Sequence, residues 1–315
     1  SDATKGWLPL EDDVTALEPV APPTQKAIFG YGYNASGGGR LSMSNLVNSS
    51  GVVAADVTGV GTARMTIAAT SYGGDKAIFG YGDSGSATNL SNLVSSSGVI
   101  ASDTTGVGTA RYAPAAASYD GDKGIFGYGD TGGDSYVSLT NLVNNSGVIA
   151  TDTTGVGTAR RYLAATGYGS SGQAVFAYGS TGSRLSMKNL VSNSGVVASD
   201  ATGVGSARNN LAAVKYGTDK AIFGYGSTGS ITGVTNLVSN VGVIASDVSG
   251  VGTARQYLAA ASYGGDKALF GYGNTASGAV SMTNLVSNIG VVGADVTGVG
   301  SARETLGAAG YSTSA

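Results

Sequence analysis

The side chains of this 315-residue chain that could do chemistry are carboxylates, tyrosines and arginines, because it contains neither histidine nor cysteine. Without them the sequence lacks the most common general base, the most common metal ligand and any thiolate metal site. We therefore expect no catalytic residue, no metal site and no cofactor. An enzyme, the less favoured alternative, would have to use Glu304, Tyr112, Arg161 and Tyr257 at a shared channel mouth.

Arginine and aspartate recur together at six places. Each of the six arginines follows an aspartate by eight residues and an asparagine by nineteen. The sets are Arg64, Arg111, Arg160, Arg208, Arg255 and Arg303; Asp56, Asp103, Asp152, Asp200, Asp247 and Asp295; and Asn45, Asn92, Asn141, Asn189, Asn236 and Asn284. Six identical settings indicate a structural role. The aspartate is expected to accept hydrogen bonds in an Asx-type turn, and the arginine to pair with an aspartate of its own or the next repeat.

The positions at which the six copies differ are the candidate recognition residues. They fall in the loop between each Phe-Gly-Tyr-Gly (or Phe-Ala-Tyr-Gly) segment and its asparagine, and directly after each repeat arginine. The candidates are Tyr33, Arg40, Tyr112, Asp134, Tyr136, Arg161, Tyr162, Arg184, Asn209, Asn210, Gln256, Tyr257 and Glu304. Such side chains suit adaptable polar contacts with a ligand or partner. Drift in unconstrained loops is the alternative explanation.

The spacing of these residues points to the elements that position them. Successive repeat arginines are 47, 49, 48, 47 and 48 residues apart, and 53 glycines with only three glutamates favour short strands joined by tight turns. Each repeat contains four strand-like segments: KAIFGYG, the Asn-Leu-Val triplet, GVVA and LAAxxY. A period of 40 to 50 residues built from four short strands is typical of β-propeller blades.

The two ends of the array predict how it closes. It begins with KAIFGYG and ends with an unpaired LAAxxY copy at 306–311. We therefore predict an all-β fold over 26–315, a six-bladed β-propeller of four-stranded antiparallel blades, closed by pairing the C-terminal strand with the first repeat. Both variable places then lie on one face, because the loop between the second and third strands leaves a blade at the same end as the link to the next blade.

Residues 1–25 lie outside the repeats. They contain four of the five prolines and the only tryptophan, so they are expected to form an extended arm rather than a central strand or a stable helix. The arm is either a linker or an anchor in which Trp7, Leu8 and Leu10 dock into a partner.

Two resemblances follow from these motifs. The segment ARQYLAAASYGGDKALFGYG at 254–273 resembles the kelch repeat, which implies that LAAxxY is the innermost strand, followed outward by KAIFGYG, Asn-Leu-Val and GVVA. The array of FGYG, TNLVSN and GTAR motifs is also similar to propeller-like structural proteins of tailed bacteriophage virions. The second resemblance implies a location on the virion surface or outside the cell.

Composition narrows the expected partners. A net charge of −3 and a pI of about 4.9 indicate no nucleic-acid partner, and no apolar run is long enough for a membrane span. We expect a non-enzymatic structural or adhesion protein of a phage particle. Its partners would be other virion or surface-assembly proteins, or a host-surface glycan. The alternative is a soluble lectin or a kelch-like protein-binding module.

Overall fold

The computed structural model describes residues 24–315, and all their regular secondary structure is β-strand. The strands form six antiparallel sheets of three or four strands and one separate two-stranded hairpin. No helix in this part of the chain is long and apolar enough to cross a membrane. The proposed anchor residues Trp7, Leu8 and Leu10 lie outside the described residues, as does most of the predicted arm.

Three strand positions recur in every sheet. The inner strands are β3 (Ala68–Tyr72), β6 (Ala115–Tyr119), β9 (Ala164–Tyr168), β12 (Ala212–Tyr216), β15 (Ala259–Tyr263) and β21 (Gly307–Tyr311). The middle strands are β1 (Lys26–Asn34), β4 (Lys76–Gly80), β7 (Lys123–Gly127), β10 (Gln173–Ala177), β13 (Lys220–Gly224) and β16 (Lys267–Gly271). The outer strands are β2 (Gly39–Val47), β5 (Ser91–Val94), β8 (Thr140–Val143), β11 (Lys188–Val191), β14 (Thr235–Val238) and β19 (Thr283–Val286). The last sheet adds β20 (Val292–Val296), and β17 (Asn274–Thr275) pairs with β18 (Gly278–Ala279) as the hairpin.

Burial explains why these segments form strands in this order. The middle strands are buried at almost every residue, because neighbouring sheets pack on both of their faces. In most inner strands burial alternates: in β3, Ala68, Thr70 and Tyr72 are buried, whereas Ala69 and Ser71 are partly exposed. The LAAxxY strand is therefore innermost and the KAIFGYG strand comes next, as expected.

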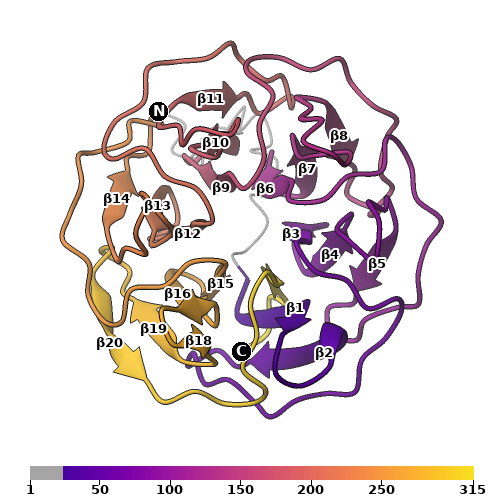
Figure 1. Cartoon of the computed structure of the whole chain (residues 1–315), viewed down its shortest axis with the longest axis vertical. Helices are drawn as coiled ribbons and strands as arrows, with labels where there is room; N and C mark the ends of the chain where they lie inside the picture. The colour runs from indigo at the N-terminus through magenta and orange to yellow at the C-terminus, as the bar shows by residue number, and fades with distance from the viewer. Residues whose placement is uncertain (1–23) are drawn as a thin grey trace, which may run out of the picture.

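The sheets lie around a common centre, with the inner strands nearest to it (Figure 1). The inner strands contact one another in the order β3, β6, β9, β12, β15 and β21, and β21 contacts β3 again. Strand β21 pairs antiparallel with β1, from Lys26↔Tyr311 to Gly30↔Gly307. This is the pairing that the C-terminal LAAxxY copy predicts, and it joins the two ends of the repeat array.

The fourth predicted strand is regular in only one sheet, where β20 pairs with β19. In the other five sheets the GVVA segment makes only isolated bridges, such as Val94↔Ile100. The repeat asparagine bonds this segment in both kinds of sheet: Asn92 Nδ2 donates to the backbone oxygen of Ala101, and Asn284 Nδ2 donates to that of Gly293, each at 3.0 Å. Even the pairing of β19 with β20 shifts its register beside this contact, between Asn284 and Val286. The prediction of four regular strands per blade therefore does not hold for these five sheets.

Aromatic pairs join each sheet to the next. The tyrosine after every middle strand packs on the phenylalanine of the following sheet, with ring centroids 5.0 to 5.3 Å apart. The pairs are Tyr31–Phe79, Tyr81–Phe126, Tyr128–Phe176, Tyr178–Phe223, Tyr225–Phe270 and Tyr272–Phe29. All twelve side chains are fully buried. The last pair joins the last repeat to the first through the same kind of contact that joins successive repeats.

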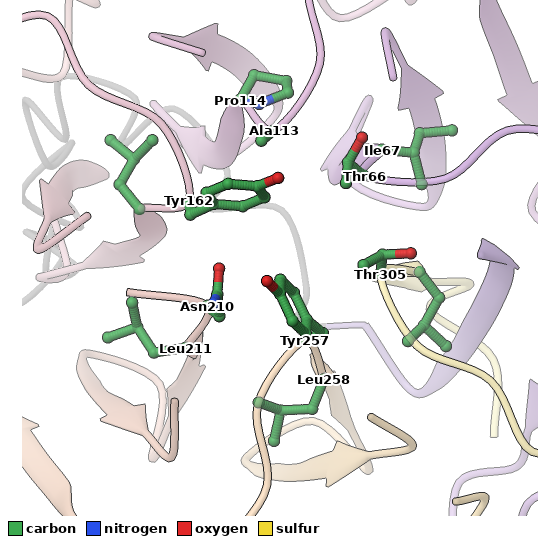
Figure 2. A pocket seen from close by; sticks show the side chains of 12 residues that line it. Thr66, Ile67, Ala113, Pro114, Tyr162, Asn210, Leu211, Tyr257, Leu258 and Thr305 are labelled. Atoms are coloured by element: carbon green, nitrogen blue, oxygen red, sulfur yellow. The ribbon is translucent and has the colours of Figure 1, made fainter. Parts of the chain in front are cut away.

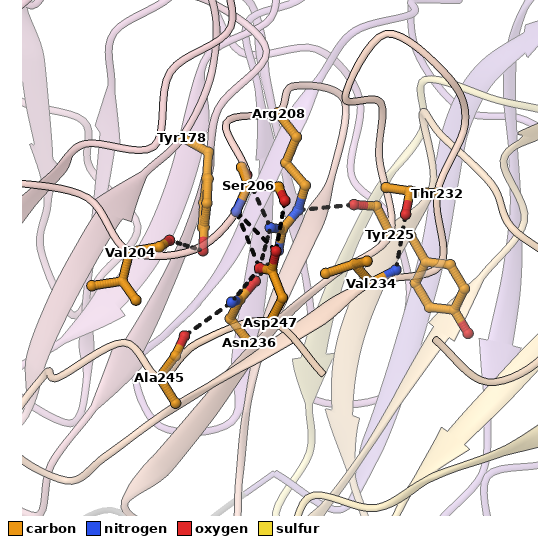
Figure 3. A network of polar contacts seen from close by, with 10 residues as sticks. All are labelled: Tyr178, Val204, Ser206, Arg208, Tyr225, Thr232, Val234, Asn236, Ala245 and Asp247. Carbon is orange, nitrogen blue, oxygen red and sulfur yellow. Dashed lines mark hydrogen bonds and ion pairs between the residues drawn. The ribbon is translucent and has the colours of Figure 1, made fainter. Parts of the chain in front are cut away.

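The repeat arginines form a second, polar connection between sheets (Figure 3). Arg208 is fully buried, its guanidinium lies 4.2 Å from the ring centroid of Tyr178, and its Nη2 donates to Asn236 Oδ1 at 2.5 Å. Asn236 in turn donates to Asp247 Oδ1 at 2.9 Å. The backbone N–H and the hydroxyl of Ser206 donate to Asp247 Oδ2 at 3.0 and 2.6 Å. Arg208 and Ser206 belong to one repeat, and Asn236 and Asp247 to the next.

This network assigns the aspartate a different role from the expected Asx-type turn. Its carboxylate receives hydrogen bonds from the preceding repeat rather than from the residues that follow it. The arginine lies 3.8 Å from the carboxylate, so the asparagine is its closer partner. Burial acts to raise the pKa of Asp247, but hydrogen bonds from Ser206 and Asn236 outweigh it and hold the pKa below its usual value.

Candidate functional site

The two variable places of each repeat lie side by side. The residue directly after each repeat arginine forms an antiparallel bridge with the fourth residue after a repeat phenylalanine. The bridged pairs are Tyr33↔Glu304, Met65↔Asp83, Tyr112↔Asp130, Arg161↔Ser180, Asn209↔Ser227 and Gln256↔Asn274. This pairing confirms the prediction that both variable places share one face. We call the surface formed by these pairs and the loops after them the variable face.

A circle of backbone hydrogen bonds organises the centre of the variable face. The second residue after each repeat arginine has a left-handed backbone conformation, with φ from 50° to 57°. The six residues are Thr66, Ala113, Tyr162, Asn210, Tyr257 and Thr305. The amide of each donates to the carbonyl of the equivalent residue in the preceding sheet at 2.8 to 3.2 Å, and Thr66 donates to Thr305. The six hydrogen bonds form a closed circle, which holds the six side chains around one point.

These six residues, together with the residue that follows each of them, line a small cavity of about 70 Å³. We call this cavity the mouth. Figure 2 shows the side chains of Tyr162, Asn210 and Tyr257 at this mouth. The two tyrosine rings meet edge to face, with centroids 5.9 Å apart and an interplanar angle of 74°. The mouth therefore presents two aromatic faces and a carboxamide from three neighbouring sheets.

Three buried oxygen atoms near this mouth have no hydrogen-bond donor within the described chain. They are Asn209 Oδ1, Asn210 Oδ1 and Glu304 Oε2. Most buried acceptors in proteins are satisfied, and leaving one without a donor costs about 1–3 kcal/mol. All three atoms are shielded from solvent, so they represent a local cost in stability and offer no accessible acceptor to a ligand.

The tyrosines at the mouth have raised pKa values. Burial raises the pKa of Tyr162 to about 12. Burial, and then the charge of Glu304, raise the pKa of Tyr257, and burial raises the pKa of Glu304 itself. Both tyrosines are thus neutral hydrogen-bonding groups at neutral pH.

A second cluster on the variable face surrounds Arg161. Its Nη1 lies 2.6 Å from Asp130 Oδ2, which also accepts a hydrogen bond of 3.0 Å from the Tyr112 hydroxyl. Its Nη2 lies 2.8 Å from Asp134 Oδ1, and its guanidinium lies 5.2 Å from the ring centroid of Tyr136. Arg161 precedes β9, whereas the other four residues flank β6 and β7, so the cluster joins two sheets. The sequence predicted four of these five residues as a binding surface, and the structure brings them together.

Asp130 is the member of this cluster that the sequence-based selection missed. It is fully buried and pairs with Arg161. Its position offered a signal, because only Asp83 and Asp130 place a carboxylate four residues after a repeat phenylalanine. Asp83 likewise pairs with an arginine from the adjoining sheet, Arg40 Nη2, at 3.0 Å.

The remaining candidates take separate positions on the same face. Tyr33 lies near the end of β1 and forms a backbone bridge with Glu304. The side-chain oxygen of Gln256 accepts a 3.4 Å hydrogen bond from Asn210. Arg184 is exposed and its Nη1 extends toward Gly229 of the next sheet. The four residues considered for an enzyme separate into two groups. Tyr257 and Glu304 lie near the mouth, where the charge of Glu304 acts on Tyr257. Arg161 donates a hydrogen bond to the hydroxyl of Tyr112 in the other group. Residues 24–315 contain no cluster of three acidic side chains that could hold a metal ion.

Comparison with known proteins adds no further assignment. No family model matches the chain, and no curated protein is similar to it in sequence. The resemblances to kelch repeats and to virion structural proteins therefore stay predictions from the sequence.

Proposed function

We propose that the chain is a closed six-bladed β-propeller and acts as a non-enzymatic structural or adhesion protein. Its variable face would bind a neighbouring protein or a host glycan on the surface of a phage particle. The observation that carries this proposal is the bridging of the two variable places in every sheet, which gathers the sequence differences on one face. Rigid frameworks with constant strands and varied loops are a common way to present recognition surfaces.

Several contacts support the closed propeller. The cyclic contacts of the inner strands, the pairing of β21 with β1 and the circle of six backbone hydrogen bonds each return from the last repeat to the first. A ring of this kind leaves no free sheet edge at either end of the array.

A glycan is the ligand class that the mouth suits best. Tyr162 and Tyr257 offer aromatic rings that carry neutral hydroxyl groups. A sugar presents apolar C–H faces to aromatic rings and hydroxyl groups to such phenolic hydroxyls. A protein partner would instead use the wider surface around Arg161, because arginine and tyrosine dominate binding energy at protein interfaces.

A glycan array tests the proposal. The purified chain is expected to bind at least one glycan, and Tyr257→Ala is expected to weaken that binding about tenfold or more, as for an interface hot spot. Ser50→Ala, an exposed change in the turn after β2 that lines neither cavity, serves as the matched control and should leave binding unchanged. If neither a glycan nor a particle protein binds, or if both variants bind equally well, the proposed role of the variable face is wrong.

The soluble lectin alternative predicts the same glycan binding without a particle. Fractionation of the native source separates the two: a virion protein sediments with particles, and a chain that starts at residue 24 loses that association. A soluble lectin stays in the unsedimented fraction whether or not residues 1–23 are present.

A further inference from the structure

A second cavity, larger than the mouth, lies at the other end of the inner strands. It has a volume of about 910 Å³ and is lined by the last residues of several inner strands and by the turns that follow them. Glycine and serine make up half of its lining residues, which also include three lysines and three aspartates: Lys123, Lys215, Lys267, Asp120, Asp122 and Asp266. The turns that line this cavity are among the most constant parts of the repeats, so the variable places do not point to it.

One position on this wall breaks the pattern of small residues. The fourth residue of the six inner strands is Ser71, Ser118, Gly167, Lys215, Ser262 or Gly310. Lys215 is the only charged member of this set, and it lines the cavity. A feature that occurs in one repeat out of six is not required by the shared scaffold, so it is a candidate for a specific function.

Lys215 also differs from the other two lysines of the cavity wall. Lys123 Nζ lies 2.6 Å from Asp120, and Lys267 Nζ lies 2.9 Å from Asp266. Lys215 makes no ion pair or hydrogen bond within residues 24–315. Burial lowers the pKa of Lys215, and the charge of Asp219 partly opposes this effect. The cavity therefore contains one partly desolvated ammonium group whose charge has no direct partner.

The surroundings of Lys215 offer hydrogen-bond donors to a ligand. On the neighbouring strand β9 the equivalent residue is Gly167, and the backbone oxygen and hydroxyl of Ser118 lie where its side chain would be. Ser262 on the other neighbouring strand and Ser118 make no side-chain hydrogen bond in the described part of the chain, unlike Ser71, whose hydroxyl donates to Gly310. Two free hydroxyl groups thus line the same cavity as the ammonium group.

We propose that this cavity binds a small polyhydroxylated carboxylate, an acidic monosaccharide, with its carboxylate on Lys215 and its hydroxyl groups on the polar wall. A carboxylate complements an unpaired ammonium group, and a charge-assisted hydrogen bond is stronger than a neutral one. The serine, asparagine and glutamine side chains supply both donors and acceptors for sugar hydroxyls. This site is separate from the variable face and does not depend on its proposed function.

Isothermal titration of the full chain with D-glucuronate, and with D-glucose as the neutral counterpart, tests the proposal. D-glucuronate is expected to bind and D-glucose to bind at least tenfold more weakly. Lys215→Met keeps the length of the side chain but removes its charge, and should weaken glucuronate binding about ten- to a hundredfold. The double variant Asp120→Asn, Lys123→Met removes a lysine of the same cavity together with its paired carboxylate, so the net charge of the cavity is unchanged and the affinity should change less than threefold.

Three results would overturn the proposal. They are the absence of glucuronate binding, equal affinity for glucuronate and glucose, and equal losses of glucuronate affinity in the Lys215 variant and its control. A thermal unfolding curve of each variant shows whether it is folded. If Lys215→Met does not fold, Lys215→Gln provides the same removal of charge with a polar side chain. Tyr257→Ala should not change glucuronate binding, so failure of this site and failure of the variable face can be told apart.

Discussion

Arg303 Nη1 lies 3.9 Å from Asp56 Oδ1, so a buried arginine of the last repeat meets a carboxylate of the first. Ser301 strengthens this contact, because its backbone N–H and hydroxyl donate to Asp56 Oδ2 at 3.0 and 2.7 Å. The same groups join Ser206 and Arg208 to the next repeat. The contact between the ends of the array is therefore the same kind of contact as those within it.

Asp56→Asn is expected to destabilise the protein by about 1–3 kcal/mol, because an amide nitrogen would replace an oxygen that accepts hydrogen bonds. The loss in the free energy of unfolding should match that of Asp247→Asn, which alters the equivalent contact between two successive repeats. Urea unfolding of both variants measures this. Asp75→Asn, at an exposed ion pair, is the control and should cost less than 1 kcal/mol. Unchanged stability of the Asp56 variant alone would show that the two ends are not joined in solution.

The stability of the protein is expected to fall in acid. Burial acts to raise the pKa of each repeat aspartate, but hydrogen bonds outweigh it and lower the pKa. A lowered folded-state pKa means that the carboxylate contributes stability above the unfolded pKa of about 3.9 and loses it as the pH falls through the folded value.

The free energy of unfolding, measured from pH 7 to pH 2, should thus be nearly constant down to about pH 5 and then decrease. Asp103→Asn removes one of the six groups and should make the decrease shallower. A stability that does not change between pH 5 and pH 2 would contradict the role given to the aspartates.

Arg161 and Asp130 are expected to be energetically coupled. Arg161→Gln leaves the fully buried Asp130 without its cation and should cost about 3 kcal/mol. The double variant Arg161→Gln, Asp130→Asn should recover part of that loss, because it removes the unpaired buried charge. A double-mutant cycle by urea unfolding measures the coupling. Additive effects of the two changes would mean that the pair is not formed in solution.

Ala309→Asp should destabilise the protein by about 3 kcal/mol or more. Ala309 is buried in β21 and faces Ile28 in the pairing with β1, so an aspartate there places a charge in the core. Thr313→Asp, at an exposed position just beyond the strand, is the matched control. Thermal unfolding distinguishes the two. Equal melting temperatures would indicate that β21 does not pair with β1.

Much of the fold follows from the sequence because each repeat carries its own strand signals. The segments LAAxxY and KAIFGYG are identified as strands from their residues, whereas their order from the centre outward is implied by the resemblance to the kelch repeat. The irregular fourth segment could not be predicted in this way. All six copies share the same segment and the same asparagine contact, yet only β20 is a regular strand.

The candidate site could also be predicted only in part from the sequence. Variation between repeats identified Arg161 and Tyr162 without a structure. It could not show that Arg161 pairs with Asp130, because the two residues are 31 positions apart and belong to different sheets. The cavity beside Lys215 was missed because the comparison of repeats concentrated on loops, whereas Lys215 lies within a strand.

The circle of backbone hydrogen bonds at the mouth has a consequence for how this surface can change. Every one of its six amides and carbonyls is used by the neighbouring sheet, and all six point around the circle in the same sense. None of the six amide N–H groups is therefore free to donate to an incoming molecule, and each carbonyl oxygen retains only its second lone pair. What the mouth recognises is set by six interchangeable side chains, so its specificity can evolve by single substitutions while the main chain stays as it is.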